Sequence, residues 1–139
     1  MRTVFADTFY WVALADPRDQ SHSEAKALSQ ALGESTLVTT KEVLSEFLDF
    51  FSQFGPASRQ AVVRRVRAIL SHPHVQVLEQ SHASFLRGLG LYEKRPDKEY
   101  SLTDCISMTA MRQAGLTEVL TNDHHFAQEG FTILFGDEA

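Results

Sequence analysis

The chain opens with Val4-Phe5-Ala6-Asp7-Thr8, an apolar run that ends at an acid. The apolar residues predict a short buried strand, and residues 8–14 predict a helix with aromatic packing residues. The same order, a strand followed by a helix, recurs along the rest of the sequence. This alternation predicts an α/β fold with a largely parallel sheet.

The remaining elements follow from apolar periodicity and from turn residues. Further strands are predicted at residues 36–39, 75–78, 118–121 and 131–134. Further helices are predicted at residues 21–33, 43–54, 57–70, 82–92 and 101–114.

Polar residues mark the ends of several of these helices. Ser21 and Thr39 each precede a glutamate by three residues, which is the spacing of a capping box. Ser101 is placed to cap the helix that Gly115 ends. We therefore expect these three side chains to accept hydrogen bonds from the first turns of their helices.

Two helices have distinctive faces. The phenylalanines between residues 43 and 54 recur at helical spacing, and we interpret them mainly as core, with a partner-binding face as the alternative. The helix at 57–70 is expected to bury its apolar residues and to expose its arginines to solvent, with contact to an RNA backbone or an acidic partner as the alternative for the arginines. The apolar set is Val62, Val63, Val66, Ile69 and Leu70, and the basic set is Arg59, Arg64, Arg65 and Arg67.

The composition limits the class of protein. A chain of 139 residues is long enough for one domain with a sizeable core. Its formal net charge of −5 argues against nonspecific binding of nucleic acid by charge alone. Cys105, expected in the core, is the only cysteine, so no intrachain disulfide can form. The sequence has neither an apolar run as long as a membrane span nor a signal-peptide core, so we expect a soluble cytoplasmic protein.

Four acidic residues that are far apart in the sequence fall where predicted elements begin or end. Asp7 and Asp123 follow apolar strands, and Glu46 and Asp104 lie in the opening turns of helices. In a parallel sheet, the carboxyl ends of the strands and the amino ends of the following helices meet at one edge. We therefore expect these four acids to converge on one pocket.

A pocket of carboxylates favours a hard divalent cation such as Mg²⁺. Several acids around such an ion leave room for a phosphate oxygen and a water, which suits hydrolysis of a phosphodiester. Each acid taken alone has an ordinary explanation as a helix cap, a partner of the helix dipole or a turn residue. Their joint placement is what favours a metal site.

Other polar residues are weaker candidates for this site. Glu42 is explained by the capping box, and Asp97 by a solvated loop. His124 and His125 are adjacent and therefore point in different directions. This favours a structural or substrate-contact role over a paired metal site.

Four segments of the chain resemble the acidic motifs of the PIN-domain nucleases. In order, they are Val4-Phe5-Ala6-Asp7-Thr8, Thr39-Thr40-Lys41-Glu42-Val43-Leu44-Ser45-Glu46, Tyr100-Ser101-Leu102-Thr103-Asp104-Cys105 and Thr121-Asn122-Asp123-His124-His125-Phe126. Their order, their spacing and the total length resemble a single PIN domain over residues 1–139. Among PIN proteins, the chain is most similar to the toxin ribonucleases of the VapC type.

This resemblance implies a three-layer α/β/α sandwich with a mostly parallel sheet of four to five strands. It also implies endonucleolytic cleavage of RNA with Mg²⁺ or Mn²⁺, a homodimer, and a cognate antitoxin of a type II toxin–antitoxin pair. By the same resemblance, the metal ligands are Asp7, Asp104 and Asp123. Glu46 completes the catalytic acids, and Thr121 supplies a hydroxyl that orients them.

One alternative remains open: a PIN-like module that binds RNA or protein without cutting it. The acidic net charge is compatible with this alternative. Two other aspartate-dependent α/β classes fit poorly. A phosphotransfer receiver requires an aspartate after a middle strand, where Glu79 stands. A haloacid-dehalogenase phosphatase requires a second aspartate where Phe9 stands.

Overall fold

The computed structural model describes residues 2–136. Its centre is a sheet of five strands, all parallel, in the order β3-β2-β1-β4-β5. The strands are β1 (Thr3–Ala6), β2 (Thr36–Thr40), β3 (Val75–Leu78), β4 (Glu118–Leu120) and β5 (Thr132–Ile133). The five strands predicted from the sequence are therefore confirmed, and β1 lies in the middle of the sheet.

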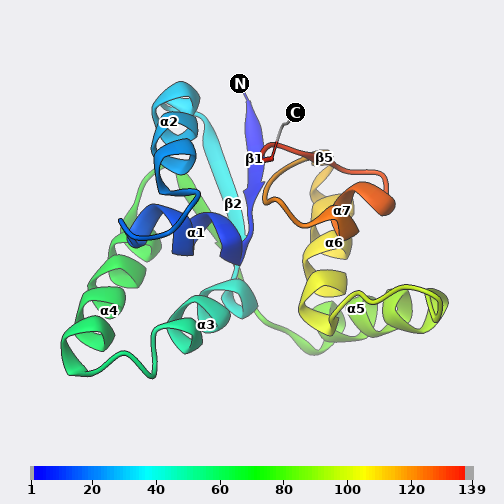
Figure 1. The fold of residues 1–139 in the computed structure, drawn as a ribbon. Helices are drawn as coiled ribbons and strands as arrows, with labels where there is room; N and C mark the ends of the chain where they lie inside the picture. The colour runs from blue at the N-terminus through cyan, green and yellow to red at the C-terminus, as the bar shows by residue number, and fades with distance from the viewer. Residues whose placement is uncertain (1, 137–139) are drawn as a thin grey trace.

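Helices cover both faces of this sheet (Figure 1). On one side lie α1 (Thr8–Ala15), α2 (His22–Leu32), α3 (Lys41–Phe50) and α4 (Pro56–Ser71). On the other side lie α5 (His82–Lys94), α6 (Leu102–Ala114) and α7 (His124–Gln128). The predicted three-layer α/β/α sandwich is confirmed.

The core lies on both faces of the central strands, packed against the first helices on one side and against α6 and α7 on the other. Val4, Phe5 and Ala6 of β1 are fully buried, and so are Val119 and Leu120 of β4. Burying a large apolar side chain stabilises a fold by roughly 2 kcal/mol. Because the central strands are buried on both faces, they read as continuous apolar runs, which is typical of parallel sheets.

All five strands end at the same edge of the sheet, where loops and helix N-termini gather. Asp7 directly follows β1, Thr40 is the last residue of β2, and Thr121 directly follows β4. The edge formed in this way carries the predicted acids. Gly115 ends α6 at the opposite edge, before β4 begins, with a φ of 72°, a left-handed conformation that favours glycine, as expected for this C-terminal stop.

The predicted cap of α3 is wrong by one residue. The hydroxyl of Thr40, not Thr39, accepts a hydrogen bond from the backbone N–H of Val43 at 3.1 Å. Thr39 belongs to β2, and its fully buried hydroxyl donates to the Ala6 carbonyl at 2.8 Å. The sheet therefore uses the hydroxyl that local spacing assigned to the helix.

The other two predicted caps have opposite outcomes. Ser21 precedes α2, but its side chain makes no capping hydrogen bond, so that prediction is wrong. The backbone N–H of Ser21 donates instead to Asp19 Oδ1 at 2.8 Å. The Ser101 cap is confirmed, and it forms a reciprocal capping box with Asp104.

The faces of the next helices differ partly from expectation. Helix α3 ends at Phe50, so residues 51–54 form a turn in which Phe51 is buried and Phe54 is exposed. In α4, Val63 and Leu70 were expected inside but are exposed, because only one stripe of this helix faces the core. That stripe is Val62, Val66 and Ile69. The arginines at 59, 64, 65 and 67 are exposed, as predicted.

A buried ion cluster ties α7 to α6 and to the loop before it. Glu129, the residue after α7, accepts two hydrogen bonds from Arg95 at 2.9 and 2.8 Å. It also accepts one from Arg112 at 2.8 Å and one from the Tyr100 hydroxyl at 2.9 Å. The Arg95 hydrogen bond, followed by those from Arg112 and Tyr100, lowers the pKa of Glu129 to about 2.

Within residues 2–136, the helices are too short or too polar to cross a bilayer.

Candidate metal centre

Asp7 is the most buried of the four predicted acids. It follows β1 at the N-terminus of α1 with 7% of its surface exposed, and its side chain makes no capping hydrogen bond. The hydroxyl of Thr121, which follows β4, donates to Asp7 Oδ2 at 2.9 Å. Burial, together with the charges of Asp104 and Glu46, raises the pKa of Asp7 to about 7.

Glu46 lies on α3, close enough to Asp7 for its charge to act on that acid. It is half-buried on α3, and its Oε1 accepts a hydrogen bond from the Thr8 hydroxyl at 2.6 Å. Thr8 begins α1 and is the neighbour of Asp7 in the sequence. The start of α1 therefore places two acids: Asp7 directly precedes the helix, and Thr8, its first residue, orients Glu46.

Asp104 takes part in the capping box of α6. Its Oδ2 accepts from the backbone N–H of Ser101 at 3.2 Å, and its own N–H donates to Ser101 Oγ at 3.0 Å. Burial, and then the charge of Asp123, raises the pKa of Asp104. The cap thus fixes the position of a carboxylate whose charge is costly in its surroundings.

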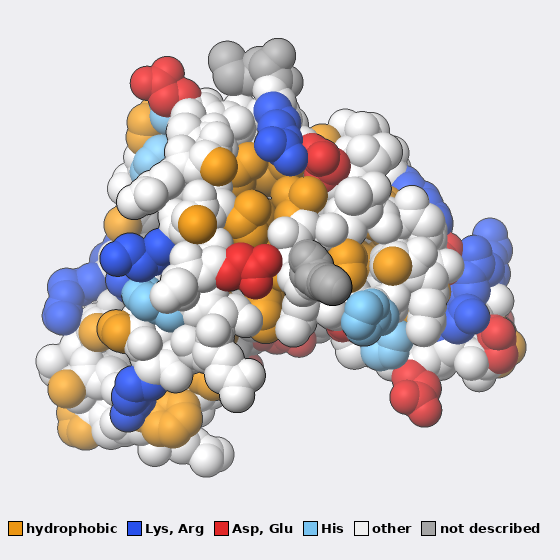
Figure 2. Space-filling view, turned by 45° about the horizontal axis from the view of Figure 1, so that its top comes forward, with side chains coloured by type: hydrophobic (Ala, Val, Ile, Leu, Met, Phe, Trp, Pro, Cys, Tyr) orange, Lys and Arg blue, Asp and Glu red, His pale blue; other side chains and the backbone are white. Residues whose placement is uncertain are grey.

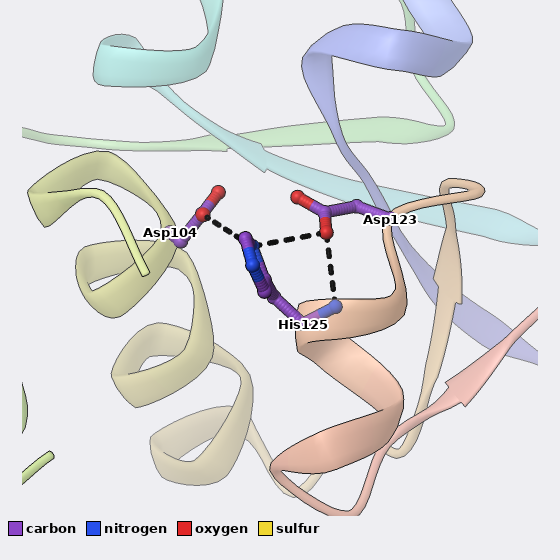
Figure 3. A group of neighbouring side chains, drawn as sticks. All are labelled: Asp104, Asp123 and His125. Carbon is purple, nitrogen blue, oxygen red and sulfur yellow. Dashed lines mark hydrogen bonds and ion pairs between the residues drawn. The ribbon is translucent and has the colours of Figure 1, made fainter. Parts of the chain in front are cut away.

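Asp123 and His125 complete the cluster from the start of α7 (Figure 3). Asp123 Oδ1 accepts from the backbone N–H of His125 at 2.9 Å, and the Asp123 N–H donates to Thr121 Oγ1 at 3.2 Å. The His125 Nδ1 atom lies 3.1 Å from Asp123 Oδ1 and 3.7 Å from Asp104 Oδ2. Ligand atoms of Asp104, Asp123 and His125 lie within 4.8 Å of one another, which is close enough to share an ion.

The structure places the four predicted acids at the carboxyl edge of the sheet, but only Asp104 and Asp123, with His125, have ligand atoms within 4.8 Å of one another. Asp7 and Glu46 lie outside that group, and their hydrogen-bond partners are Thr121 and Thr8. The charge of Glu46 and that of Asp104 both act on Asp7, and the charge of Asp123 acts on Asp104. Thr121 connects two of the acids, since it donates to Asp7 and accepts from Asp123.

The donor set fits a hard divalent cation. Within residues 2–136, no lysine or arginine forms an ion pair with any of the four acids. Clustered carboxylates without a cationic partner raise one another's pKa, and a bound cation would offset that repulsion. Oxygen ligands of this kind suit Mg²⁺ or Mn²⁺.

His125 is the member of the cluster that sequence reasoning did not assign to it. The prediction that His124 and His125 do not act as a pair is consistent with the structure, in which His124 is exposed and only His125 enters the cluster. The signal was the spacing: His125 lies two residues after an acid that caps a short helix. That helix, α7, was not predicted, so the spacing carried no geometric meaning.

Comparison with known proteins assigns the family. The sequence pattern of the PIN domain matches residues 4–131. The chain belongs to the PIN-domain family. This PIN domain is 28% identical over 131 residues to the 23S rRNA-specific endonuclease VapC20 of Mycobacterium tuberculosis, covering 92% of this chain and 95% of VapC20.

Solved structures agree with this assignment. The crystal structure of M. tuberculosis VapC20, described as a sarcin–ricin loop cleaving toxin, superposes on this PIN domain with a TM-score of 0.82 at 26% identity. The match covers 93% of this chain and 96% of that one. The structure of FitAcB from Neisseria gonorrhoeae superposes with a TM-score of 0.70 at 14% identity, over 95% of this chain and 96% of that one, and shows the fold alone. The resemblance inferred from the sequence is confirmed.

Proposed function

We propose that this PIN domain is a divalent-metal-dependent endoribonuclease that hydrolyses RNA phosphodiester bonds. The observation that carries the proposal is the acid site of a PIN domain, in which no lysine or arginine among residues 2–136 forms an ion pair with the four acids. Similarity to VapC20, which is named as an rRNA endonuclease, supports RNA as the substrate class. It also supports the role of toxin in a type II toxin–antitoxin pair, acting in the cytoplasm.

In this proposal, Asp7, Asp104 and Asp123 hold the cation, and Glu46 completes the catalytic acids. When bound, Mg²⁺ or Mn²⁺ supplies positive charge for the phosphoryl oxygens and lowers the pKa of a bound water. The neighbouring hydroxyls keep the carboxylates in place. Thr121 donates to Asp7 and Thr8 donates to Glu46, so both acids are oriented before substrate arrives.

The net charge of −5 does not conflict with an RNA substrate, because the basic residues are not evenly spread. Figure 2 shows lysine and arginine side chains at the left and right flanks and one at the top centre. The exposed arginines Arg59, Arg64, Arg65 and Arg67 all lie on α4. Cations at these flanks can contact phosphates on either side of a cut. The clustered acids of the site are the part of the surface that a metal would neutralise.

The proposed protein partners are a cognate antitoxin and a second copy of this chain. Both would need apolar surface, and the helices that flank the site expose large apolar side chains. On the side of α3 and α4 these are Phe50, Phe54, Val63 and Leu70, and on α5 they are Phe85, Leu86 and Leu89. Sedimentation of the isolated protein tests the dimer, and co-purification with the product of an adjacent gene tests the antitoxin.

The test of the nuclease function is cleavage of RNA with and without Mg²⁺ or Mn²⁺. We expect cleavage that chelation abolishes and that Asp104→Ala removes, while a folded Asp49→Asn variant, changed at an exposed acid of α3, retains it. Calorimetric titration of the ion separates this function from a silent binding module. A folded protein that binds neither ion and cuts no RNA would overturn the proposal.

A further inference from the structure

A polar cavity of about 250 Å³ lies between the end of α5 and the loop that leads to α6. Its lining includes two aromatic rings, two cations and one acid. The lining residues are Tyr92, Arg95, Pro96, Lys98, Glu99 and Tyr100. The volume is slightly below the usual range for small-molecule sites, so it suits a single ring system rather than a helix or a strand of a partner.

Two side chains in contact connect the cavity to the acid cluster, since Tyr100 lines the cavity and His125 belongs to the cluster. The rings of Tyr100 and His125 meet edge to face, with their centroids 5.5 Å apart. On the far side of that contact, His125 Nδ1 lies 3.1 Å from Asp123. A polymer whose reacting bond lies at the acids can therefore place a neighbouring unit in the cavity.

The two cations of the cavity are held in different ways. Arg95 uses Nε and Nη2 to bind Glu129, so its guanidinium is fixed in position while 36% of the side chain stays exposed. This leaves Nη1 able to donate to a ligand. Lys98 is 34% exposed and lies 3.8 Å from Asp97, a distance that makes only a weak ion pair.

Tyr92 provides the open aromatic surface. It lies on the last turn of α5 and is 52% exposed, so one part of its ring is free to stack on a flat ligand. Glu129 already offsets the charge of Arg95, and Asp97 and Glu99 add negative charge beside Lys98. Affinity for a phosphate alone would therefore be modest, and stacking must supply much of the binding.

We propose that this cavity binds one nucleotide of the RNA substrate, next to the bond that is cut. The base stacks on Tyr92, and its phosphate lies near Arg95 and Lys98. An unstacked base of single-stranded RNA is the ligand that an aromatic ring beside fixed cations recognises. This inference rests on the proposed function, and it adds a subsite that sets which part of an RNA strand is held at the acids.

The experiment compares Tyr92→Ala with its parent in the binding of a labelled single-stranded RNA of roughly 12 nucleotides, a length that spans such a site. Fluorescence anisotropy is measured in the Asp7→Asn background with Mg²⁺. We expect Tyr92→Ala to weaken binding about tenfold, the usual effect of losing one stacked base. Tyr92→Phe keeps the ring and should recover most of that affinity.

A matched control separates stacking from a general loss of apolar surface. Phe54 is 55% exposed, close to the 52% of Tyr92, but it lies in the turn after α3 and outside the cavity. Phe54 also belongs to the apolar surface proposed for protein partners, so this variant is measured at a concentration at which sedimentation gives it the same oligomeric state as its parent. Under that condition, Phe54→Ala should leave RNA affinity unchanged. Lys98→Ala should weaken binding and reduce the salt dependence of log K by about 0.7, the value for one contact to a single strand.

Kinetics in the Asp7-containing protein provide a second readout. Tyr92→Ala should raise KM about tenfold with little change in kcat, because the subsite binds substrate before and during the reaction alike. RNA affinity of Tyr92→Ala within twofold of its parent, or an equal loss in Phe54→Ala, would overturn the subsite. Binding without any cleavage would instead overturn the nuclease and leave the subsite standing.

Discussion

At the scale of single residues, the buried acid Asp7 is placed at a cost to stability. Its pKa of about 7 lies far above the ordinary 3.8, mainly because it is buried. As the pH rises from 3.8 to 7, the folded protein keeps a proton that the unfolded chain has lost, so the metal-free protein loses stability over that window. Above pH 7 the loss is complete. Functional sites commonly carry such strain.

We therefore predict that Asp7→Asn stabilises the metal-free protein while it abolishes cleavage. In EDTA at pH 8, the free energy of unfolding should rise by about 1–3 kcal/mol, and at pH 4 the difference should nearly vanish. Urea unfolding at the two pH values measures it. Asp49→Asn, at an exposed position, should change neither stability nor activity. A variant less stable than its parent at both pH values would contradict the assignment of Asp7 as a strained acid.

A second residue prediction concerns the hydroxyl of Thr121. This fully buried residue donates to Asp7 and accepts from the Asp123 N–H, so it links two of the proposed ligands. Thr121→Val keeps the shape but loses both hydrogen bonds, and we expect metal affinity and cleavage to fall about 10–100-fold. Thr121→Ser should retain most of both. Calorimetry with Mn²⁺ measures the affinity, and equal losses in the two variants would show that the hydroxyl is not the cause.

The acids were predictable from the sequence because each stands at the end of a strand or in the first turns of a helix. Parallel topology alone brings such positions to one edge. His125 was not predictable, because its role depends on the direction of a side chain at the start of an unpredicted helix. The hydrogen bond between Thr8 and Glu46 joins residues on separate helices, and no local pattern indicates it.

At the scale of elements, the packing of α5 on α6 depends on Gly88. A Cβ atom at this position would overlap Ile106 Cγ1 and lie 3.1 Å from the Ile106 backbone N and Cα. The backbone of α6 has little freedom to move there, because Cys105, Met108 and Met111 of α6 are fully buried in the core. Gly90, two residues further along α5, would place its Cβ in open space.

The two glycines therefore form a matched pair for a stability test. Gly88→Ala should lower the free energy of unfolding by about 1–3 kcal/mol, since overpacking outweighs the better helix propensity of alanine. Gly90→Ala should raise it by about 0.5–1 kcal/mol through that propensity. Thermal or urea unfolding of both variants measures the contrast. Stabilisation by both substitutions would show that α5 can move away from α6.

Most elements were predicted because strong apolar runs and turn residues define them. Helix α7 was missed because its five residues are too few to show a helical period. The cap of α3 was misplaced because Thr39 and Thr40 both satisfy the local rule, and only the hydrogen bond across to β1 decides between them. Val63 and Leu70 were wrongly expected in the core, because the part of α4 that packs on the protein is narrower than the apolar face that its sequence shows.

At the scale of the whole molecule, the site is formed by segments from both halves of the chain. Asp7 and Glu46 come from the first half, and Asp104 and Asp123 come from the second. The sheet joins the halves where β1 pairs with β4. The fold class was predictable from the alternation of elements, but the buried cluster around Glu129 was not, because its members are spread over residues 95–129.

The cluster around Glu129 makes the stability of the whole protein depend on pH in the acidic range. Glu129 has a pKa of about 2 against an ordinary 4.5, because Arg95, Arg112 and Tyr100 donate hydrogen bonds to its carboxylate. A lowered carboxyl pKa stabilises the fold above the unfolded value, and this stabilisation is lost as the pH falls through the folded value. It should therefore be complete above about pH 4.5 and disappear toward pH 2.

We predict that Glu129→Gln lowers the free energy of unfolding by roughly 2 kcal/mol at pH 6, because a charged, hydrogen-bonded group is lost from a buried site. The difference from the parent should shrink between pH 4.5 and 2, where Glu129 of the parent itself becomes protonated.

The control is Glu79→Gln, whose 82%-exposed side chain lies 3.5 Å from Lys41 and should change stability by less than about 0.5 kcal/mol. Urea unfolding in EDTA at pH 6 and pH 3 measures both variants. Because the cluster fixes the loop that carries Tyr100 into α6, Glu129→Gln should also weaken metal binding at the acids. A Glu129→Gln variant with a difference from its parent that is the same at both pH values would show that the charge of Glu129 is not what stabilises the fold.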